Sequence, residues 1–190
     1  MIQRVQSLYL LLTLGALIIL SVGTDVFVTE VAQKDQFDII SHGNVYGVQK
    51  DLHVHGDLTD ENITLLKEAT GKVDIDGDMI GIPTYYFPFY SITILLSMLT
   101  VVVLLGYKNL KRQLKLGRLL FVLNFLLFGA SIALYYLLRS NTIPESSDYT
   151  ASVHLSFGFY CIVIALAFSF LANIGIRRDV RLIKSIDRIR

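Results

Sequence analysis

Basic residues crowd the segment Lys108-Asn109-Leu110-Lys111-Arg112-Gln113-Leu114-Lys115-Leu116-Gly117-Arg118, which contains five of them and no acidic residue. A long apolar run lies on each side of this segment. Basic residues that lie close to membrane-spanning helices stay in the cytoplasm. The segment 108–118 is therefore predicted to be a cytoplasmic loop that joins two transmembrane helices.

Apolar runs of membrane-spanning length recur along the chain. Hydrophobic residues make up 53% of the 190 residues, a modest excess over the roughly 45–50% of soluble domains, but they are concentrated in runs that match the roughly 20 residues of a spanning helix. We predict transmembrane helices over 7–29, 85–107, 119–138 and 153–174. The predicted fold class is a membrane all-α protein, a four-transmembrane-helix bundle with a small α+β or mostly β extracytoplasmic subdomain between helices 1 and 2.

The first apolar run also fits a cleavable signal peptide. No small-residue cleavage site of the A-x-A type follows it, and no cysteine stands there for lipid attachment. Because the run is long enough to span, we interpret it as an uncleaved helix that follows a short cytoplasmic N-terminus over 1–6.

The segment 30–84 has a different composition, with eleven acidic and four basic residues and thus a net charge of minus seven. Two alternating stretches, 37–40 and 45–48, flank Ser41-His42-Gly43-Asn44 and predict a hairpin. A capping signal at 59–62 predicts a short helix over 63–69, and the alternation of 72–78 predicts a strand. We expect a small subdomain that leans on the membrane helices, because so short a segment buries little core of its own.

Charge asymmetry orients the predicted helices. The N-terminus, the 108–118 loop and the tail 175–190 carry twelve basic residues, whereas the segment 30–84 and the short outer loop 139–152 carry five. With four spans, both termini and the 108–118 loop lie on the same side, which the positive-inside rule makes cytoplasmic. The predicted location is the inner membrane of a bacterium, with residues 30–84 outside the cytoplasm.

The basic residues are the predicted docking groups. They suit the anionic lipids of the cytoplasmic leaflet or a protein partner, and the tail fits an amphipathic helix on either; a frayed basic tail is the alternative. The residues are Lys108, Lys111, Arg112, Lys115, Arg118, Arg177, Arg178, Arg181, Lys184, Arg188 and Arg190.

Two groups of residues resemble metal sites, and we do not predict that either group binds a metal. His53 and His55 share one face of a strand and, with Asp51 or Asp57, form the ligand types of a transition metal; solvated surface histidines are the simpler interpretation. Asp74, Asp76 and Asp78 resemble part of a calcium loop but lack its terminal bidentate glutamate. We expect no metal and no cofactor.

Polar and small residues inside the apolar runs are predicted to serve helix packing. Asn124 is expected to hydrogen-bond within the membrane, an interaction worth about 1 kcal/mol, rather than to form a transport site. Ala165, Ser169 and Asn173 lie four apart and form a small-residue stripe for close helix approach. Packing within one chain is preferred to a dimer face.

Cys161 is the only cysteine and the only ionisable residue within a predicted helix interior. A C-x-x-C redox pair is therefore excluded, and the absence of other ionisable residues argues against a pump, an electron carrier and a thiol oxidoreductase. We expect no enzymatic activity and no nucleic-acid partner.

The two ends of the chain resemble one family. The opening Met1-Ile2-Gln3-Arg4-Val5-Gln6-Ser7-Leu8-Tyr9-Leu10-Leu11-Leu12 and the closing Leu171-Ala172-Asn173-Ile174, Asp179, Leu182-Ile183-Lys184-Ser185 and Asp187-Arg188-Ile189-Arg190 are similar to domain-of-unknown-function family 4293, a family of small bacterial membrane proteins. The resemblance implies an inner-membrane protein without an assigned activity, and it supplies no catalytic residues.

Three hypotheses follow. The first is a structural or accessory component of an envelope complex, with a protein partner or a second copy docked on its charged ends. The second is a small transporter or channel subunit, and the third is a membrane enzyme with its site near His53 and His55.

Overall fold

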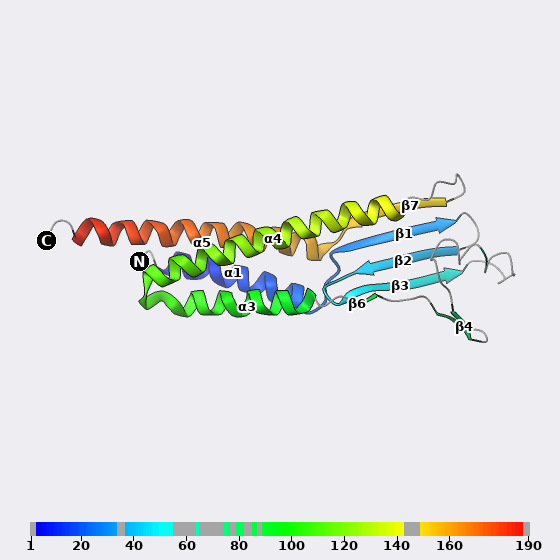
Figure 1. Ribbon diagram of the computed structural model, residues 1–190, viewed down its shortest axis with the longest axis horizontal. Coiled ribbons are helices and arrows are strands. Elements are labelled where there is room, and N and C mark those ends of the chain that lie inside the picture. The colour runs from blue at the N-terminus through cyan, green and yellow to red at the C-terminus, as the bar shows by residue number, and fades with distance from the viewer. Residues whose placement is uncertain are drawn as a thin grey trace.

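The computed structural model describes residues 3–33, 37–54, 64, 74–76, 79–81, 85–86, 89–142 and 149–187. The molecule is long and narrow, with helices at one end and a sheet at the other (Figure 1). Both chain ends and the turn between α3 and α4 lie at the helical end (Figure 1).

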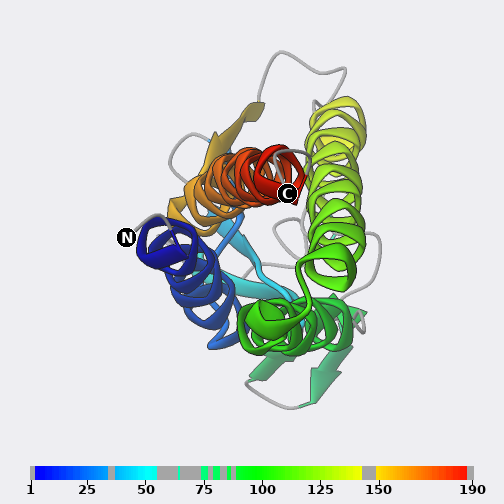
Figure 2. The ribbon, with the colours of Figure 1, turned by 90° about the vertical axis from the view of Figure 1, so that its left-hand side faces the viewer.

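Long helices form the first half of this arrangement. They are α1 (Gln3–Ser21), α3 (Phe89–Leu105), α4 (Leu110–Thr142) and α5 (Phe157–Asp187), with a short 3-10 turn over Gly106–Lys108. Figure 2, which looks along the molecule from the helical end, shows them side by side around a common axis. α5 packs between α1 and α4, and α3 closes the bundle against α1 and α4.

An antiparallel sheet of five strands forms the second half. Its order is β6-β3-β2-β1-β7. The strands are β1 (Phe27–Gln33), β2 (Phe37–Gly43), β3 (Gly47–Val54), β6 (Tyr85–Tyr86) and β7 (Tyr149–Leu155). A separate pair joins β4 (Asp74–Asp76) to β5 (Met79–Gly81). β7 comes from a segment more than a hundred residues after β1, and it leads directly into α5.

The hairpin predicted from the acidic segment is confirmed, because β2 and β3 pair antiparallel. Its turn lies at Asn44–Tyr46 rather than 41–44. The Asn44 side-chain oxygen accepts the backbone N–H groups of Tyr46 and Gly47 at 2.9 and 3.1 Å, which is the local bonding that makes asparagine a turn residue. The strand predicted over 72–78 appears as β4, whereas the helix predicted over 63–69 lies outside the described residues except at Thr64.

The predicted four-transmembrane-helix bundle of an all-α membrane protein is wrong. Within the described ranges, two helices are long and apolar enough to cross a membrane, over 110–139 and 157–182. The apolar stretches of α1 and α3, over 5–21 and 89–105, are shorter, and 17 residues of helix rise about 26 Å against a hydrocarbon core of about 30 Å. The sheet also takes the molecule out of the all-α class.

Strands occupy one end of three of the apolar runs that were predicted as helices. In the run predicted as a helix over 7–29, the helix ends at Ser21 and strand β1 begins at Phe27. Gly23, which lies between them, has a φ of 101°, a conformation that favours glycine. The run over 85–107 begins with β6 and the run over 153–174 begins inside β7. Conversely, the predicted loop 108–118 is mostly the first part of α4, because it has no proline and its one glycine costs a helix only about 1 kcal/mol.

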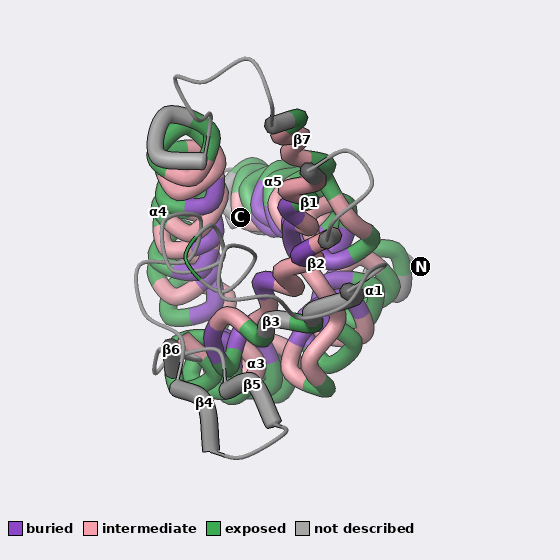
Figure 3. Tube along the Cα trace, turned by 90° about the vertical axis from the view of Figure 1, so that its right-hand side faces the viewer, coloured by how far each residue is buried: buried purple, intermediate pink, exposed green. Residues whose placement is uncertain are grey.

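Buried positions on the helices follow a coiled-coil spacing of alternating three and four residues, which brings one stripe of each helix to a common axis. On α1 the stripe is Gln6, Leu10, Thr13, Leu17 and Leu20; on α3 it is Thr93, Leu96, Thr100 and Val103; on α5 it is Ala165, Ser169, Ala172, Ile176 and Asp179. Figure 3 shows these buried stretches turned towards the axis, with exposed stretches on the outside.

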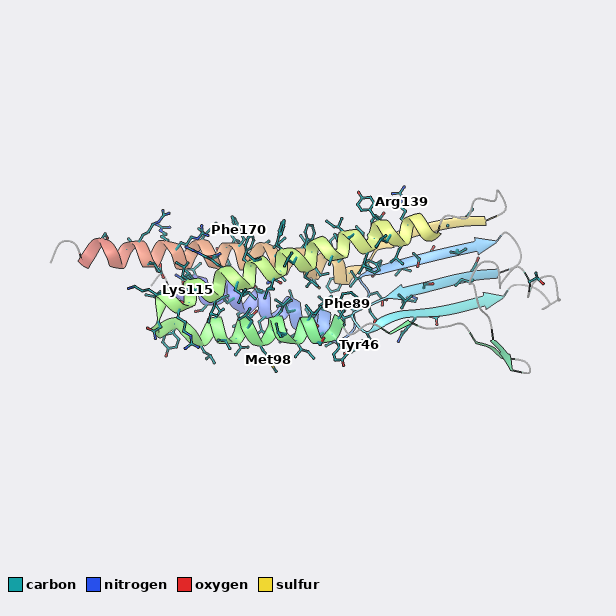
Figure 4. The ribbon with its side chains drawn as sticks, in the orientation of Figure 1. Tyr46, Phe89, Met98, Lys115, Arg139 and Phe170 are labelled. Carbon is teal, nitrogen blue, oxygen red and sulfur yellow. The ribbon has the colours of Figure 1, made fainter. Side chains whose placement is uncertain are left out.

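The outside of the bundle is apolar. Leu126 on α4 is 60% exposed, and Met98 on α3 and Phe170 on α5 are also exposed; Figure 4 shows the last two on the outer surface. In the most apolar 18-residue stretches of α4 and α5 only 17% and 39% of the residues are buried. A core helix of a soluble protein would be mostly buried, so these helices present their apolar side chains outwards.

The loop 22–26 fastens the sheet to the bundle. The Val26 N–H donates to the Gly43 carbonyl at 2.7 Å, and the Ser156 N–H donates to the Val26 carbonyl at 3.0 Å. The Gly158 N–H donates to the Asp25 carbonyl at 2.7 Å. The first turn of α5 is thus bonded to the chain that leaves α1, and Leu20, Val26, Phe27, Val45 and Ile162 form a buried cluster there.

We predict that Gly158→Ala destabilises the protein by about 1–3 kcal/mol. A Cβ at residue 158 would lie 2.6 Å from the Asp25 carbonyl oxygen and 2.9 Å from that of Thr24, and backbone atoms have little room to move. Thermal unfolding of the purified full-length protein in detergent measures the effect. The matched control is Gly129→Ala on α4, where a Cβ meets nothing within 4 Å and alanine adds helix propensity; an equal loss in both variants would contradict the tight junction.

Candidate functional site

The bundle interior holds polar side chains, and the most polar pair joins α1 to α5 near the end away from the sheet. Gln6 and Asp179 are 3% and 7% exposed, and the Gln6 side-chain N–H donates to the Asp179 carboxylate. The other carboxylate oxygen, Oδ1, is buried and has no hydrogen-bond partner. Gly175 makes room for this pair, since a Cβ there would lie 2.8 Å from Gln6 Cγ.

A carboxylate that is buried in this way needs its amide donor. Burial of a charged group is costly unless hydrogen bonds replace its water. Because the Gln6 amide supplies one of these bonds, the contact favours the one axial register of α1 against α5 that brings the two side chains together. The sequence alone does not reveal this contact, because Asp179 stands among the charged residues of the tail. Its spacing from Ile176 and Ala172 continues the buried stripe and is the signal that identifies it. Both residues lie in the end segments that carried the family resemblance.

Further polar groups line the bundle between this pair and the sheet. The hydroxyls of Thr13, Thr93, Thr100, Ser131 and Ser169 donate to carbonyls three or four residues earlier in their own helices. Gln113 donates to the Val103 carbonyl at 3.2 Å and ties α4 to α3. These bonds are mostly local, so the polar groups are satisfied without opening the core.

The four residues predicted for helix packing are all buried in this interior. Asn124 donates to the Leu120 carbonyl at 3.0 Å, whereas the side-chain oxygens of Asn124 and Asn173 have no partner. Because α4 and α5 run antiparallel with Gly117 against Ile176, equal steps along both helices bring Asn124 level with Ser169. Ala165 is fully buried in the same stripe. The role of the four in packing stays a prediction.

A second cluster lies on the sheet beside the junction. His42 at the end of β2 places Nδ1 3.0 Å from Asp25 Oδ2 and Nε2 3.8 Å from Asp51 Oδ2. Asp25 precedes β1 and Asp51 lies on β3, so the imidazole lies between carboxylates from two neighbouring segments. An imidazolium carries an N–H donor on each nitrogen, and in that state it faces both carboxylates with opposite charge. His42 was predicted only as a turn residue.

The predicted metal ligands are only partly described. Register places His53 on β3 opposite Asp38, and Asp74 and Asp76 lie on β4. His55 and Asp78 lie outside the described residues. No three His, Cys, Asp or Glu side chains in the described ranges are placed to hold a metal ion.

The predicted docking residues gather at the helical end. Lys111, Arg112, Lys115 and Arg118 are exposed on the first turns of α4, and Arg177, Arg178 and Arg181 are exposed on α5; Figure 4 marks Lys115 there. Lys108 lies in the 3-10 turn, Lys184 lies in α5, and Arg188 and Arg190 lie outside the described residues. The tail up to Asp187 continues α5 as one helix and does not form a separate surface helix.

The architecture defines a class: an elongated α and β protein with two helices of membrane-spanning length among its described residues, an apolar exterior and an interior that mixes polar and apolar side chains. The family model described as Domain of unknown function (DUF4293) matches residues 2–189. The chain therefore belongs to this family, which confirms the resemblance seen at its two ends. A search of curated proteins found none that matches.

We predict that Gln6→Leu and Asp179→Leu each destabilise the protein by about 2 kcal/mol, because each leaves the other polar group buried without a partner. The double variant removes both groups, so its loss is smaller than the sum by at least about 1 kcal/mol. Thermal unfolding in detergent of the three variants and the parent protein measures this coupling.

The control cycle pairs Gln6→Leu with Asp51→Ala, an exposed position on the sheet at the opposite end of the molecule. Those two changes are expected to be additive. Additive losses for Gln6 and Asp179 as well would contradict a direct bond between them.

Proposed function

We propose that this protein is an integral membrane docking protein, an accessory component of a bacterial envelope complex. Helices α4 and α5 cross the inner membrane with α1 and α3 packed along them, and the sheet stands outside the cytoplasm. The single observation that carries the proposal is what we call the reversed polarity of the bundle: its exterior is apolar, and its interior mixes polar with apolar side chains.

The reversed polarity favours lipid over water as the solvent of the bundle. Monomeric soluble proteins rarely expose apolar patches larger than a few hundred Å², whereas exposed large apolar side chains recur here on the outer faces of α1, α3, α4 and α5. Lipid tails do not drive helices together, so membrane bundles use small and polar residues at their contacts. Thr13, Thr100, Asn124, Ser169 and Asn173 match that composition.

Charge supports the orientation. The exposed basic residues of α4 and α5 lie at the end that also holds both chain ends, which the positive-inside rule assigns to the cytoplasm. The opposite end holds the sheet, on which Glu30 and Asp51 are exposed. α5 runs without interruption from the sheet to this basic end. The protein thus offers an acidic surface on one side and a basic surface on the other, joined by a stiff bundle, as expected of a docking protein.

Labelling of single cysteines with a membrane-impermeant maleimide tests the membrane placement. In a Cys161→Ser background, Gln49→Cys on the sheet should react in intact spheroplasts, and Ser185→Cys near the end of α5 should react only after lysis. Both positions are exposed, so access to the reagent depends on the membrane alone. Reaction of both before lysis, or release of the protein from membranes at alkaline pH, would contradict the placement.

Charge reversal on the sheet tests the docking role. The protein purified natively in mild detergent should retain a stoichiometric partner, and Glu30→Lys with Asp51→Lys should weaken this association at least about tenfold at low salt, because opposite charges steer such contacts. The matched control replaces Thr150 and Gln49 by Lys, which introduces the same number of lysines on the sheet without removing an acid. A partner that is lost equally from both variants, or never present, would refute docking through the acids.

A further inference from the structure

We propose that the outer edge of β7 binds an extended segment of another protein, with apolar and basic residues in alternation, as a sixth strand of the sheet. β7 is the last strand of the order β6-β3-β2-β1-β7 and pairs, among the described residues, only with β1. Figure 1 shows it along the rim of the sheet.

The hydrogen-bond pattern identifies the backbone groups that face outwards. The Ser156 N–H donates to Val26, one step beyond the pair Phe27 and Leu155. Bonded pairs alternate along antiparallel strands, so Thr150, Ser152 and His154 bond to β1. The N–H and C=O groups of Ala151, Val153 and Leu155 therefore point away from β1 and are available to a further strand.

β7 itself has none of the sequence features that normally prevent strand addition. Exposed edges are usually blocked by lysine, proline, a bulge or a very short strand. β7 is seven residues long and reads Tyr-Thr-Ala-Ser-Val-His-Leu, without proline or a permanently charged residue. Its seven residues pair with β1 in continuous register, without a bulge. Strand addition at such an edge is a common mode of peptide recognition.

A second copy of this chain does not fit the edge. β7 runs roughly along the length of the bundle (Figure 1), so an antiparallel β7 from another copy would direct its helices away from the membrane. A parallel β7 related by a two-fold axis would set identical amides opposite each other, N–H against N–H. The first argument rests on the proposed membrane placement; the second does not.

The surroundings define the side chains of the added strand. Ala151, Val153 and Leu155 share one face of the sheet, which favours apolar residues beside them. On the other face Ser152 lies opposite Glu30 of β1, and the register continues this face to Asp38 of β2 and Asp51 of β3. An added strand would lie about 10 Å from β1, within reach of a lysine side chain, so charge favours basic residues on this face.

Hydrogen exchange of the full-length protein in a neutral detergent tests the proposal, with a heptapeptide of alternating lysine and valine as the probe. In the free protein the amides of Thr150, Ser152 and His154 should exchange slowly and those of Ala151, Val153 and Leu155 rapidly. Peptide at about ten times its Kd should slow the second set by about tenfold. A peptide of alternating glutamate and valine should have a much weaker effect.

Proline variants provide the matched control. Val153→Pro removes an outward N–H, so it should abolish the effect of the peptide while the inward amides stay protected. Ser152→Pro removes an amide bonded to β1 and should expose the whole strand. The peptide experiment on the wild-type protein tests the proposal without the variants, so a variant that fails to fold does not change its outcome.

Four results would overturn the proposal. Three are outward amides already protected in the dilute free protein, no slowing by the basic peptide, and equal slowing by the acidic one. The fourth is protection that rises with protein concentration alone, together with a doubled mass, which would assign the edge to a second copy. The detergent experiment decides the edge independently of the membrane placement, which the cysteine labelling decides.

Discussion

The polarity of the helical bundle governs the rest of the structure. Each helix turns a narrow stripe inwards and a broad apolar surface outwards, and the inward stripes contain Thr13, Thr100, Asn124, Ser169 and Asp179 beside leucines and alanines. In water the outward surface would be costly. In lipid it costs nothing, and association depends instead on close packing and polar contacts between helices. The Gln6–Asp179 bond and the Gln113–Val103 bond are contacts of that kind.

The helical bundle holds the sheet in a fixed orientation. α1 passes through one short loop into β1, and β7 passes through Ser156 into α5, so the two central helices continue into neighbouring strands. Backbone bonds from Val26, Ser156 and Gly158 hold these connections together. Tyr46 adds a further tie, since its hydroxyl donates to the Ser21 carbonyl at 2.7 Å and its ring stacks on Tyr90. The bundle therefore sets the orientation of the sheet, because hydrogen bonds and packed side chains connect the two.

Local patterns predicted some of this structure. The hairpin of β2 and β3 was found because alternation and an Asn turn are signals of short range. The apolar runs located the helices, but run length misjudged their ends: Phe27 and Val28 continue the apolar run of α1 yet belong to a strand, and Val153 to Leu155 continue that of α5. Hydrophobicity does not distinguish a strand from a helix over a few residues, and β7 exists because β1, far away in sequence, is there to pair with it. Local patterns also do not reveal contacts between segments, such as the Asp25–His42–Asp51 cluster between neighbouring strands and the Gln6–Asp179 bond between residues 173 positions apart.

The most direct test of the reversed polarity is spin-label accessibility in vesicles. A nitroxide at Leu126 on the exposed face of α4 should collide with oxygen and not with a water-soluble nickel chelate, and one at Gln49 on the sheet should show the opposite preference. Collision of the chelate with the label at Leu126, at the rate found at Gln49, would show that water surrounds the bundle and would contradict the account.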